Sequence, residues 1–196
     1  MAAQHDDTTP YAPGIRLCMP DDLGPGASVQ AGPAEAHYLC HVMRCKVGDE
    51  IALFNGRDGE WRARIDGCSK KAVTLVCVAL IREQTRPADI WLLFAPVKRA
   101  RLDFIVEKAT ELGVGVLCPV FTRFTQADRV RVERMASTAR EAAEQCGRLE
   151  VPDVADPRKL ADVLDGWNPA RLLFFCDEGG DVPAMATALD AAARGP

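Results

Sequence analysis

Hydrophobic and polar positions along this chain follow changing periods, and the clearest change lies between residues 90 and 120. Residues 90–95 form a short apolar run, as expected of a strand covered on both faces. A helical period follows, with a stripe formed by Leu102, Ile105, Val106, Ala109 and Leu112. Gly113 stands where a left-handed C-terminal cap belongs, and residues 114–120 are apolar again. We predict a strand–helix–strand unit with a basic corner at residues 98–101, where open α/β sheets gather ligands.

The first half of the chain has the shorter period of β-structure. In residues 60–65, Trp61, Ala63 and Ile65 alternate with Glu60, Arg62 and Arg64, which predicts one apolar face and one mostly basic face. Further strands are expected at residues 15–19, 50–54 and 72–81, and a helix opens at Pro33 and includes Cys45. Residues 21–32 are rich in turn formers. The pattern favours a small barrel-like β domain over residues 15–84, after a flexible polar tail at residues 1–14.

A second domain is expected over residues 88–196, beyond a polar linker that contains Pro87. After the strand–helix–strand unit, the pattern predicts a helix at residues 126–146 and a short helix near residues 160–164. A buried strand is expected at residues 171–176, followed by an alanine-rich helix at residues 183–193. The predicted fold class is therefore α/β plus a small β-barrel.

Composition adds a local charge asymmetry to this picture. The net charge is −4, but residues 86–148 carry 11 basic and 8 acidic side chains, whereas both flanking regions are net negative. Such a basic region can bind phosphate on an acidic protein, although solvated helix faces would give the same count. The eight scattered cysteines favour reduced thiols in a cytosolic protein. No apolar run approaches the length of about 20 residues that a membrane helix needs, and the polar start is no secretory signal.

Motifs for common enzyme chemistries are missing from the sequence. It contains no GxSxG, HExxH, Walker A or GxGxxG pattern. His37, His41 and Cys45 share a helical spacing, but no fourth ligand stands at a recognisable distance, so we predict a packing helix and no metal site. The acidic segment at residues 177–180 has the context of a ligand loop, but a plain acidic turn explains it better, because acidic side chains would repel phosphates.

Four segments together resemble a known family. They are CHVMR (40–44), VGDEIALFNG (47–56), KRARLDFIVEKATELGV (98–114) and EAAEQCGRLEVP (141–152). Their order and spacing are similar to those of the RsmE family, ribosomal RNA methyltransferases that act on uridine N3 of 16S RNA. The resemblance implies an N-terminal PUA-like RNA-binding barrel, and a SPOUT α/β domain whose trefoil knot binds S-adenosylmethionine. It also implies a cytoplasmic homodimer that acts on the small ribosomal subunit.

The resemblance also implies site residues. Those expected near the reacting uridine are Arg16, Lys98, Arg101, Gln145 and Arg148. Phosphates of the RNA would be held on the barrel by Arg62, Arg64, Lys70 and Lys71. Cys176 and Asp177 are the candidates for contact with the cofactor. Glu111 and Glu144 are expected to be structural partners of arginines, and the general base is not identified.

One departure from the family pattern is large. The GPEGG and LGxRILRxETA segments that make most of the family's cofactor site do not occur in this sequence. We therefore expect a family member without its knot, and one that does not bind the cofactor tightly. Two further functions stay open on the sequence: a non-catalytic RNA-binding module, and a dimeric scaffold that binds no RNA.

Overall fold

The strands expected in the first half of the chain form one five-stranded sheet in the computed structural model, which describes residues 14–69, 71–125, 130–177, 179 and 182–192. The strand order is β1-β3-β4-β5-β2. β1 runs parallel to β3, and the other neighbours are antiparallel. The strands are β1 (Arg16–Cys18), β2 (Ser28–Ala31), β3 (Glu50–Phe54), β4 (Glu60–Cys68) and β5 (Val73–Arg82).

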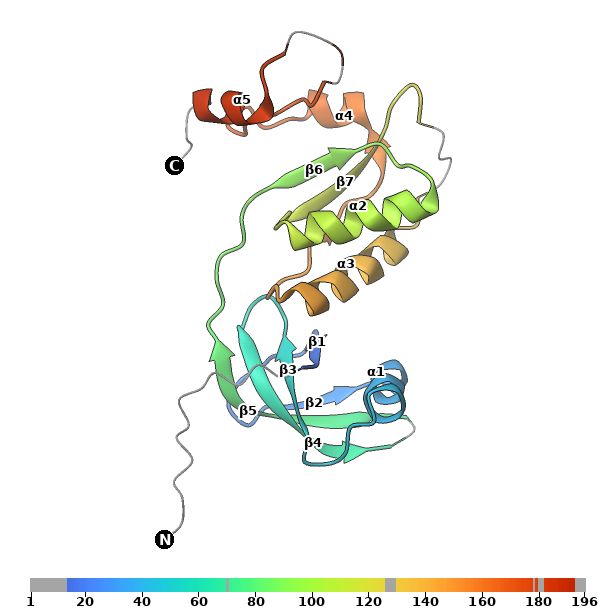
Figure 1. Cartoon of the computed structure of the whole chain (residues 1–196), viewed down its shortest axis with the longest axis vertical. Helices are drawn as coiled ribbons and strands as arrows, with labels where there is room; N and C mark the ends of the chain where they lie inside the picture. Colours follow the sequence, from blue (N-terminus) through green and yellow to red (C-terminus); the bar gives the residue numbers. More distant parts are fainter. Residues whose placement is uncertain (1–13, 70, 126–129, 178, 180–181, 193–196) are drawn as a thin grey trace. The chain divides into compact units, whose positions relative to one another are not determined.

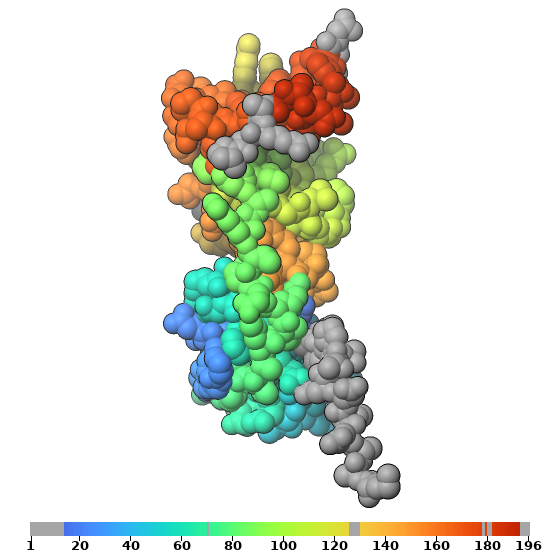
Figure 2. Space-filling model, turned by 90° about the vertical axis from the view of Figure 1, so that its left-hand side faces the viewer, coloured from blue at the N-terminus to red at the C-terminus, as the bar shows by residue number. Residues whose placement is uncertain are grey.

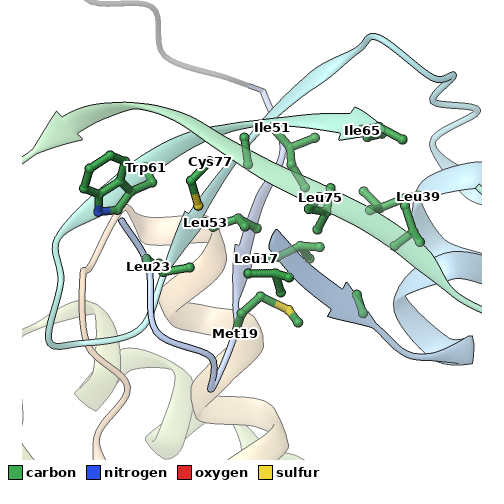
Figure 3. Packing of buried hydrophobic residues seen from close by; sticks show 14 of the residues in the cluster. Leu17, Met19, Leu23, Leu39, Ile51, Leu53, Trp61, Ile65, Leu75 and Cys77 are labelled. Carbon is green, nitrogen blue, oxygen red and sulfur yellow. The ribbon is translucent and has the colours of Figure 1, made fainter. Parts of the chain in front are cut away.

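Side chains from all five strands point into one interior, which Figure 3 shows from close by. The alternation of β4 is confirmed, because Trp61, Ala63 and Ile65 are buried in this core. Register shifts along the pairing of β4 with β5 mark β-bulges, which bend and twist a strand pair. Glu60 is the exception to the pattern: it was expected on the polar face, yet only 4% of it is exposed.

Two local predictions for this sheet were wrong. Residues 21–32 include a strand, β2, which pairs with β5 between Ser28 and Ala31. The helix that opens at Pro33 is shorter than expected. It consists of α1 (Pro33–His37) and one π-helical turn, η1 (Tyr38–Val42), and Arg44 beyond it has a left-handed φ of 59°. The turn buries Leu39 but leaves Val42 exposed, and Cys45 packs against the core from beyond the end of η1.

The expectation of eight reduced cysteines is corrected for one pair. Cys40 in η1 and Cys68 at the end of β4 form a disulfide across 28 residues of sequence. The other six cysteines are thiols, of which Cys77 and Cys118 are buried. The spacing of the cysteines does not predict this disulfide, because η1 and the end of β4 come together only in the folded chain. The cysteine pattern therefore no longer supports a reducing compartment by itself.

The strand–helix–strand unit predicted around the basic corner is confirmed. β6 (Trp91–Phe94) and β7 (Val116–Phe121) are parallel, and α2 (Arg99–Glu111) connects them. α3 (Val132–Cys146) lies beside α2, and both helices cover one face of the sheet (Figure 1). Short strands β8 (Asp153–Val154) and β9 (Arg158–Lys159) also pair with β7 in parallel. Gly113 has a φ of 92°, as the predicted helix cap requires.

Burial of this unit is less complete than its sequence suggests. Residues 90–95 were expected to be covered on both faces, but half of Ile90 and 42% of Trp91 are exposed. Leu112 is 82% exposed, so the apolar stripe of α2 ends at Ala109. The helices cover only one face of the sheet. The hydrophobic run therefore predicted the strand correctly but not the exposure of its second face. The chain between β5 and β6, green in Figure 2, lies on the surface.

Residues 1–160 and residues 161–196 form two compact units, which we call unit 1 and unit 2. The sheet, the strand–helix–strand unit and α3 belong to unit 1. Unit 2 contains α5 (Met185–Ala191), and α4 (Leu160–Asp165) begins at the boundary. The strand predicted at residues 171–176 was wrong: the segment is irregular, pairs with no described strand and leaves Phe175 80% exposed. Among the described residues, no helix is both long and apolar enough to cross a membrane.

Candidate nucleic-acid interface

A pocket of about 970 Å³ lies at the carboxyl ends of the parallel strands β6 and β7. We call it the basic pocket. Its charged lining residues are mostly cationic and come from the turn after β6 and from the starts of α2 and α3. They are Lys98, Arg99, Arg101, Arg131 and Arg134, with Asp103 as the acidic member. Two hydroxyls, from Thr122 and Thr125, complete the polar lining. This is the edge of the sheet at which the sequence predicted a ligand site.

Two helices begin at this pocket. Lys98 is the N-cap of α2 and Arg131 is the N-cap of α3, and neither makes a side-chain capping hydrogen bond. The first turn of α2 contains no acidic residue, whereas that of α3 contains Glu133. The free backbone N–H groups and the positive end of a helix dipole favour anions, so each helix start adds to the attraction of the cations around it. The arrangement can therefore hold phosphate groups.

One ion pair is fixed inside the pocket. The guanidinium of Arg134 on α3 donates to both carboxylate oxygens of Asp103 on α2, at 3.1 and 2.6 Å. The hydrogen bond from Arg134 holds the pKa of Asp103 below its usual range, and the charges of Arg134 and Arg99 add to this. The pair links the two helices across the pocket. By contrast, the side chains of Lys98, Arg101 and Arg131 have no hydrogen bond or ion pair with any residue that the structure describes.

A second group of charged residues joins the barrel to the α/β part of unit 1. We call it the interlock, and it consists of Arg16, Glu60, Arg82, Glu144 and Arg148. Arg16 donates to the carbonyls of Ala143, Glu144 and Arg148 at 2.8, 2.9 and 2.6 Å. Its guanidinium also lies 4.5 Å from the ring centroid of Phe54. A single arginine of β1 thus binds the C-terminal end of α3.

The carboxylate of Glu60 ties two arginines of the interlock together. It accepts hydrogen bonds from Arg16 and from Arg82, the latter at 2.7 Å, and Arg82 also donates to the Gly147 carbonyl at 2.8 Å. Burial by itself would raise the pKa of Glu60, but the hydrogen bonds from Arg82 and Arg16 outweigh it and lower the pKa. Glu60 is therefore a buried, ionised bridge between the barrel and the end of α3.

Arg148 and Glu144 complete the interlock. Arg148 donates to the carbonyls of Thr110 and Val114, at 2.9 and 2.8 Å, and so binds the C-terminal end of α2. Glu144 accepts a hydrogen bond from the backbone N–H of Cys18 at 3.0 Å. Burial raises the pKa of Glu144 in spite of that hydrogen bond.

The predicted site residues are thus divided between several places. Lys98 and Arg101 line the basic pocket, whereas Arg16 and Arg148 belong to the interlock and do not line it. Gln145 is exposed on the last turn of α3, outside the pocket lining. The catalytic roles expected for these residues stay predictions. Glu111 pairs with Lys108 at 2.8 Å, a lysine where an arginine was expected.

The predicted RNA-binding residues of the barrel lie apart from the pocket lining. Arg62 lies 3.6 Å from Glu50 and Arg64 lies 3.6 Å from Asp66, while Lys71 is exposed. Lys70 lies outside the described residues. Cys176 and Asp177, the predicted cofactor contacts, are exposed in the irregular segment of unit 2, where Asp177 accepts a hydrogen bond from the Gly179 N–H.

Several residues of both groups were not predicted. In the interlock these are Glu60 and Arg82, and in the pocket they are Arg99, Arg131, Arg134 and Phe124. The basic corner at residues 98–101 already contained Arg99. The start of α3 carried a similar signal, the basic side chains of Arg131 and Arg134 around the first turn of the helix.

A barrel-type domain followed by an α/β unit with a cationic pocket is an arrangement that suits a nucleic-acid-binding protein. Comparison with known families agrees with this class. Residues 84–194 match the RNA methyltransferase domain family, and residues 32–77 match the RNA methyltransferase PUA domain. The first match covers more than half of the chain, so the chain belongs to the RNA methyltransferase domain family.

Curated relatives confirm the resemblance to the RsmE family. Ribosomal RNA small subunit methyltransferase E of Rickettsia conorii is 30% identical over 76% of this chain and 60% of the relative. The protein of the same name from Synechocystis is 28% identical over 90% of this chain and 59% of the relative. The chain thus spans about 60% of the length of these relatives.

Solved structures give the same result for the fold. The small subunit methyltransferase E of Neisseria gonorrhoeae, bound to S-adenosylmethionine, is 25% identical with a TM-score of 0.73, over 82% of this chain and 67% of that one. A methyltransferase of Legionella pneumophila in complex with the same cofactor is 27% identical with a TM-score of 0.71, over 78% and 66%. The PUA-like and α/β assignments of the sequence agree with these neighbours.

Proposed function

We propose that the protein functions in S-adenosylmethionine-dependent methylation of uridine N3 in 16S ribosomal RNA, as a cytoplasmic homodimer that acts on the small ribosomal subunit. We propose further that this chain supplies RNA binding and is itself inactive in methyl transfer, because it lacks the family's cofactor segments. The observation that carries the proposal is the basic pocket in a chain of the RNA methyltransferase domain family. Its cations and two helix starts suit the phosphates of an RNA strand, and they lie at the sheet edge where α/β proteins bind ligands.

The chemistry of uridine N3 also suits this pocket. The nitrogen carries a proton, so methylation requires its removal and leaves negative charge on the base. Lys98 and Arg101, whose side chains have no hydrogen bond or ion pair among the described residues, can hold that charge or the neighbouring phosphates. Asp103 is held by Arg134 in its ionised form, and its role is to link α2 to α3.

The described residues do not fit the methyl donor. S-adenosylmethionine carries a sulfonium cation, and the basic pocket would repel it, because the pocket is lined by five cationic side chains and one carboxylate. Cys176 and Asp177 are exposed in an irregular segment and form no cradle. We therefore assign the pocket to RNA. We expect the 196-residue chain to bind the donor more weakly than micromolar, and micromolar binding by calorimetry would contradict this assignment.

Binding of RNA tests the proposal directly. We expect a labelled single-stranded fragment of 16S RNA to bind in fluorescence anisotropy, with an affinity that falls steeply with salt. Lys98→Ala and Arg101→Ala should each weaken binding several-fold and flatten the salt dependence. The matched control is Arg57→Ala, an exposed arginine of the barrel that pairs with Asp22 at 2.8 Å. Equal effects of all three variants would count against the pocket as the binding site.

The barrel residues provide a second binding test. Arg62, Arg64, Lys70 and Lys71 are proposed to hold phosphates, and changing all four to Ala should weaken binding without changing preference among RNA sequences. Retained binding would refute this assignment.

Catalysis is separated from binding by a transfer assay. The chain is incubated with small ribosomal subunits and radiolabelled S-adenosylmethionine, and the RNA is digested to nucleosides. N3-methyluridine would establish the activity in this chain. Salt-sensitive RNA binding without transfer would favour the non-catalytic RNA-binding module, and absence of binding would favour the dimeric scaffold.

A further inference from the structure

The turn that follows β7 presents an aromatic ring at the basic pocket. Phe124 lines the pocket and is 82% exposed. A single exposed phenylalanine is common on protein surfaces, so its significance rests on what lies around it in the pocket. No motif in the sequence distinguished this residue from a core phenylalanine.

The ring stands on a turn that its own hydrogen bonds close. The backbone N–H of Thr122 donates to the Thr125 hydroxyl at 2.8 Å, and the two threonine hydroxyls lie 3.0 Å apart. The N–H of Thr125 returns a hydrogen bond to the Thr122 carbonyl at 3.2 Å. Because the turn is fixed in this way, the phenylalanine backbone loses little further freedom when a ligand binds.

One cation lies close to the ring, and others line the same pocket. The guanidinium of Arg123 lies 5.4 Å from the centroid of Phe124, within cation–π distance. Lys98, Arg101 and Arg131 line the same pocket. The site therefore combines an aromatic face with positive charge, which is the combination that binds single-stranded nucleic acid: bases stack on the ring and cations hold the backbone.

The surroundings do not suit a protein partner. A stable protein interface buries about 800 Å² on each side, whereas one aromatic side chain supplies roughly 150–250 Å². Among the described pocket-lining residues, Val97 is the one other large hydrophobic side chain that is strongly exposed. An isolated ring among cations is a poor core for such an interface.

We propose that Phe124 is a base-stacking residue, which takes an unpaired nucleobase of the RNA on its face while the cations of the basic pocket hold the adjoining phosphates. Arg123 covers one face of the ring, and the base takes the other. The substrate class is thus RNA that is single-stranded at the contacted nucleotide. This inference rests on the proposed RNA binding and adds a contact to the base, where the cations supply only contacts to the backbone.

The test compares two RNA ligands on the 196-residue chain. One is a labelled single-stranded oligonucleotide, and the other has the same backbone with abasic sites in place of bases. Phe124→Ala should weaken binding of the first by about 5- to 150-fold, the range expected for loss of one stacked base, and leave binding of the abasic ligand unchanged. Phe124→Trp should retain affinity, and the fluorescence that it adds to that of Trp61, Trp91 and Trp167 should be quenched by the ordinary oligonucleotide alone.

Phe104 provides the matched control. It is 59% exposed on α2, has a cation–π contact with Lys108 at 5.7 Å and does not line the pocket. Phe104→Ala should bind both ligands like the unmodified chain. Equal weakening of both ligands by Phe124→Ala, no weakening of either, or a change from dimer to monomer in light scattering would each overturn the proposal.

Failure of the proposed function gives a different result. If the unmodified chain binds no RNA, both proposals fall together. If it binds, and Lys98→Ala and Arg101→Ala weaken binding while Phe124→Ala does not, the stacking inference alone falls.

Discussion

The two ends of α2 and α3 use the same residue type in opposite ways. At the C-terminal ends, Arg16 and Arg148 donate to backbone carbonyls, and one face of Arg16 lies on Phe54. At the N-terminal ends, Lys98, Arg101 and Arg131 line an open pocket. A helix dipole favours cations at its C-terminus and disfavours them at its N-terminus. The interlock therefore stabilises the fold, whereas the basic pocket is unfavourable until an anion binds.

Charge alone therefore does not assign a role to an arginine. Only 13% of the Arg16 side chain is exposed, and its donors have partners in the protein. The pocket cations lie at the N-terminal ends of α2 and α3, where the helix dipoles repel them. Such an arrangement lowers stability and persists where function requires it.

The largest effect is expected for Glu60→Ala. The change removes the carboxylate that joins Arg16 to Arg82 and leaves a buried guanidinium without its counter-ion, which typically costs about 3–5 kcal/mol. Urea denaturation would measure it. The matched control is Glu50→Ala on the neighbouring strand, whose ion pair with Arg62 spans 3.6 Å and should contribute less than about 1 kcal/mol. Similar losses in both variants would mean that the interlock stabilises the fold no more than the ordinary ion pair between Glu50 and Arg62 does.

The next effect is expected for Arg148→Met. Methionine keeps much of the side-chain volume but leaves the carbonyls of Thr110 and Val114 without this donor. We expect a loss of roughly 2–3 kcal/mol in the free energy of unfolding. Arg131→Met, at the start of α3, makes the same chemical change in the pocket and should stay within about 0.5 kcal/mol. If Arg131→Met were the more destabilising, the contrast between the two helix ends would be wrong.

A smaller change, with the opposite sign, is expected for Arg101→Ala. Removal of a cation from the first turn of α2 should raise the free energy of unfolding by about 0.3–1 kcal/mol at low salt. The same change should weaken RNA binding. Thermal unfolding with and without RNA would measure both effects, and 1 M salt should abolish the gain in stability. A loss of stability without RNA would show that this arginine contributes to the fold after all.

The sequence predicted those parts of the fold that depend on local period. The alternation in β4 and the strand–helix–strand unit were predicted correctly, because the order of apolar and polar side chains along the sequence indicates which face is buried. Gly113 marked the end of α2 for a similarly local reason. The basic corner was found because its residues adjoin in sequence as they do in the pocket.

The rest depends on contacts that sequence period does not encode. Arg16 meets Ala143 across 127 residues, and its local sequence looks like that of any arginine in a strand. Glu60 continued a polar alternation, yet a β-bulge and two arginines bury it. Residues 171–176 had the composition of a strand, but a strand also needs a partner, and none pairs with them in the described part of the chain.

The smallest effect concerns pH and Glu144, the one interlock carboxylate whose pKa is raised. Burial disfavours its ionised form, so the folded protein binds a proton more tightly than the unfolded chain does. Its contribution to stability is present below the ordinary glutamate range and is lost as pH rises through the raised pKa. Glu60, with its lowered pKa, acts in the opposite direction and loses its contribution as pH falls.

Glu144→Gln keeps an oxygen acceptor for the Cys18 N–H but does not titrate. Urea midpoints measured over a pH series should therefore decline less above the glutamate range in Glu144→Gln than in the unmodified chain. Glu141→Gln removes only a smaller contribution to the raised pKa of Glu144, the Glu141 charge, and should therefore reduce the decline by less than Glu144→Gln does. An unaltered decline in Glu144→Gln would mean that this carboxylate is not desolvated against the barrel.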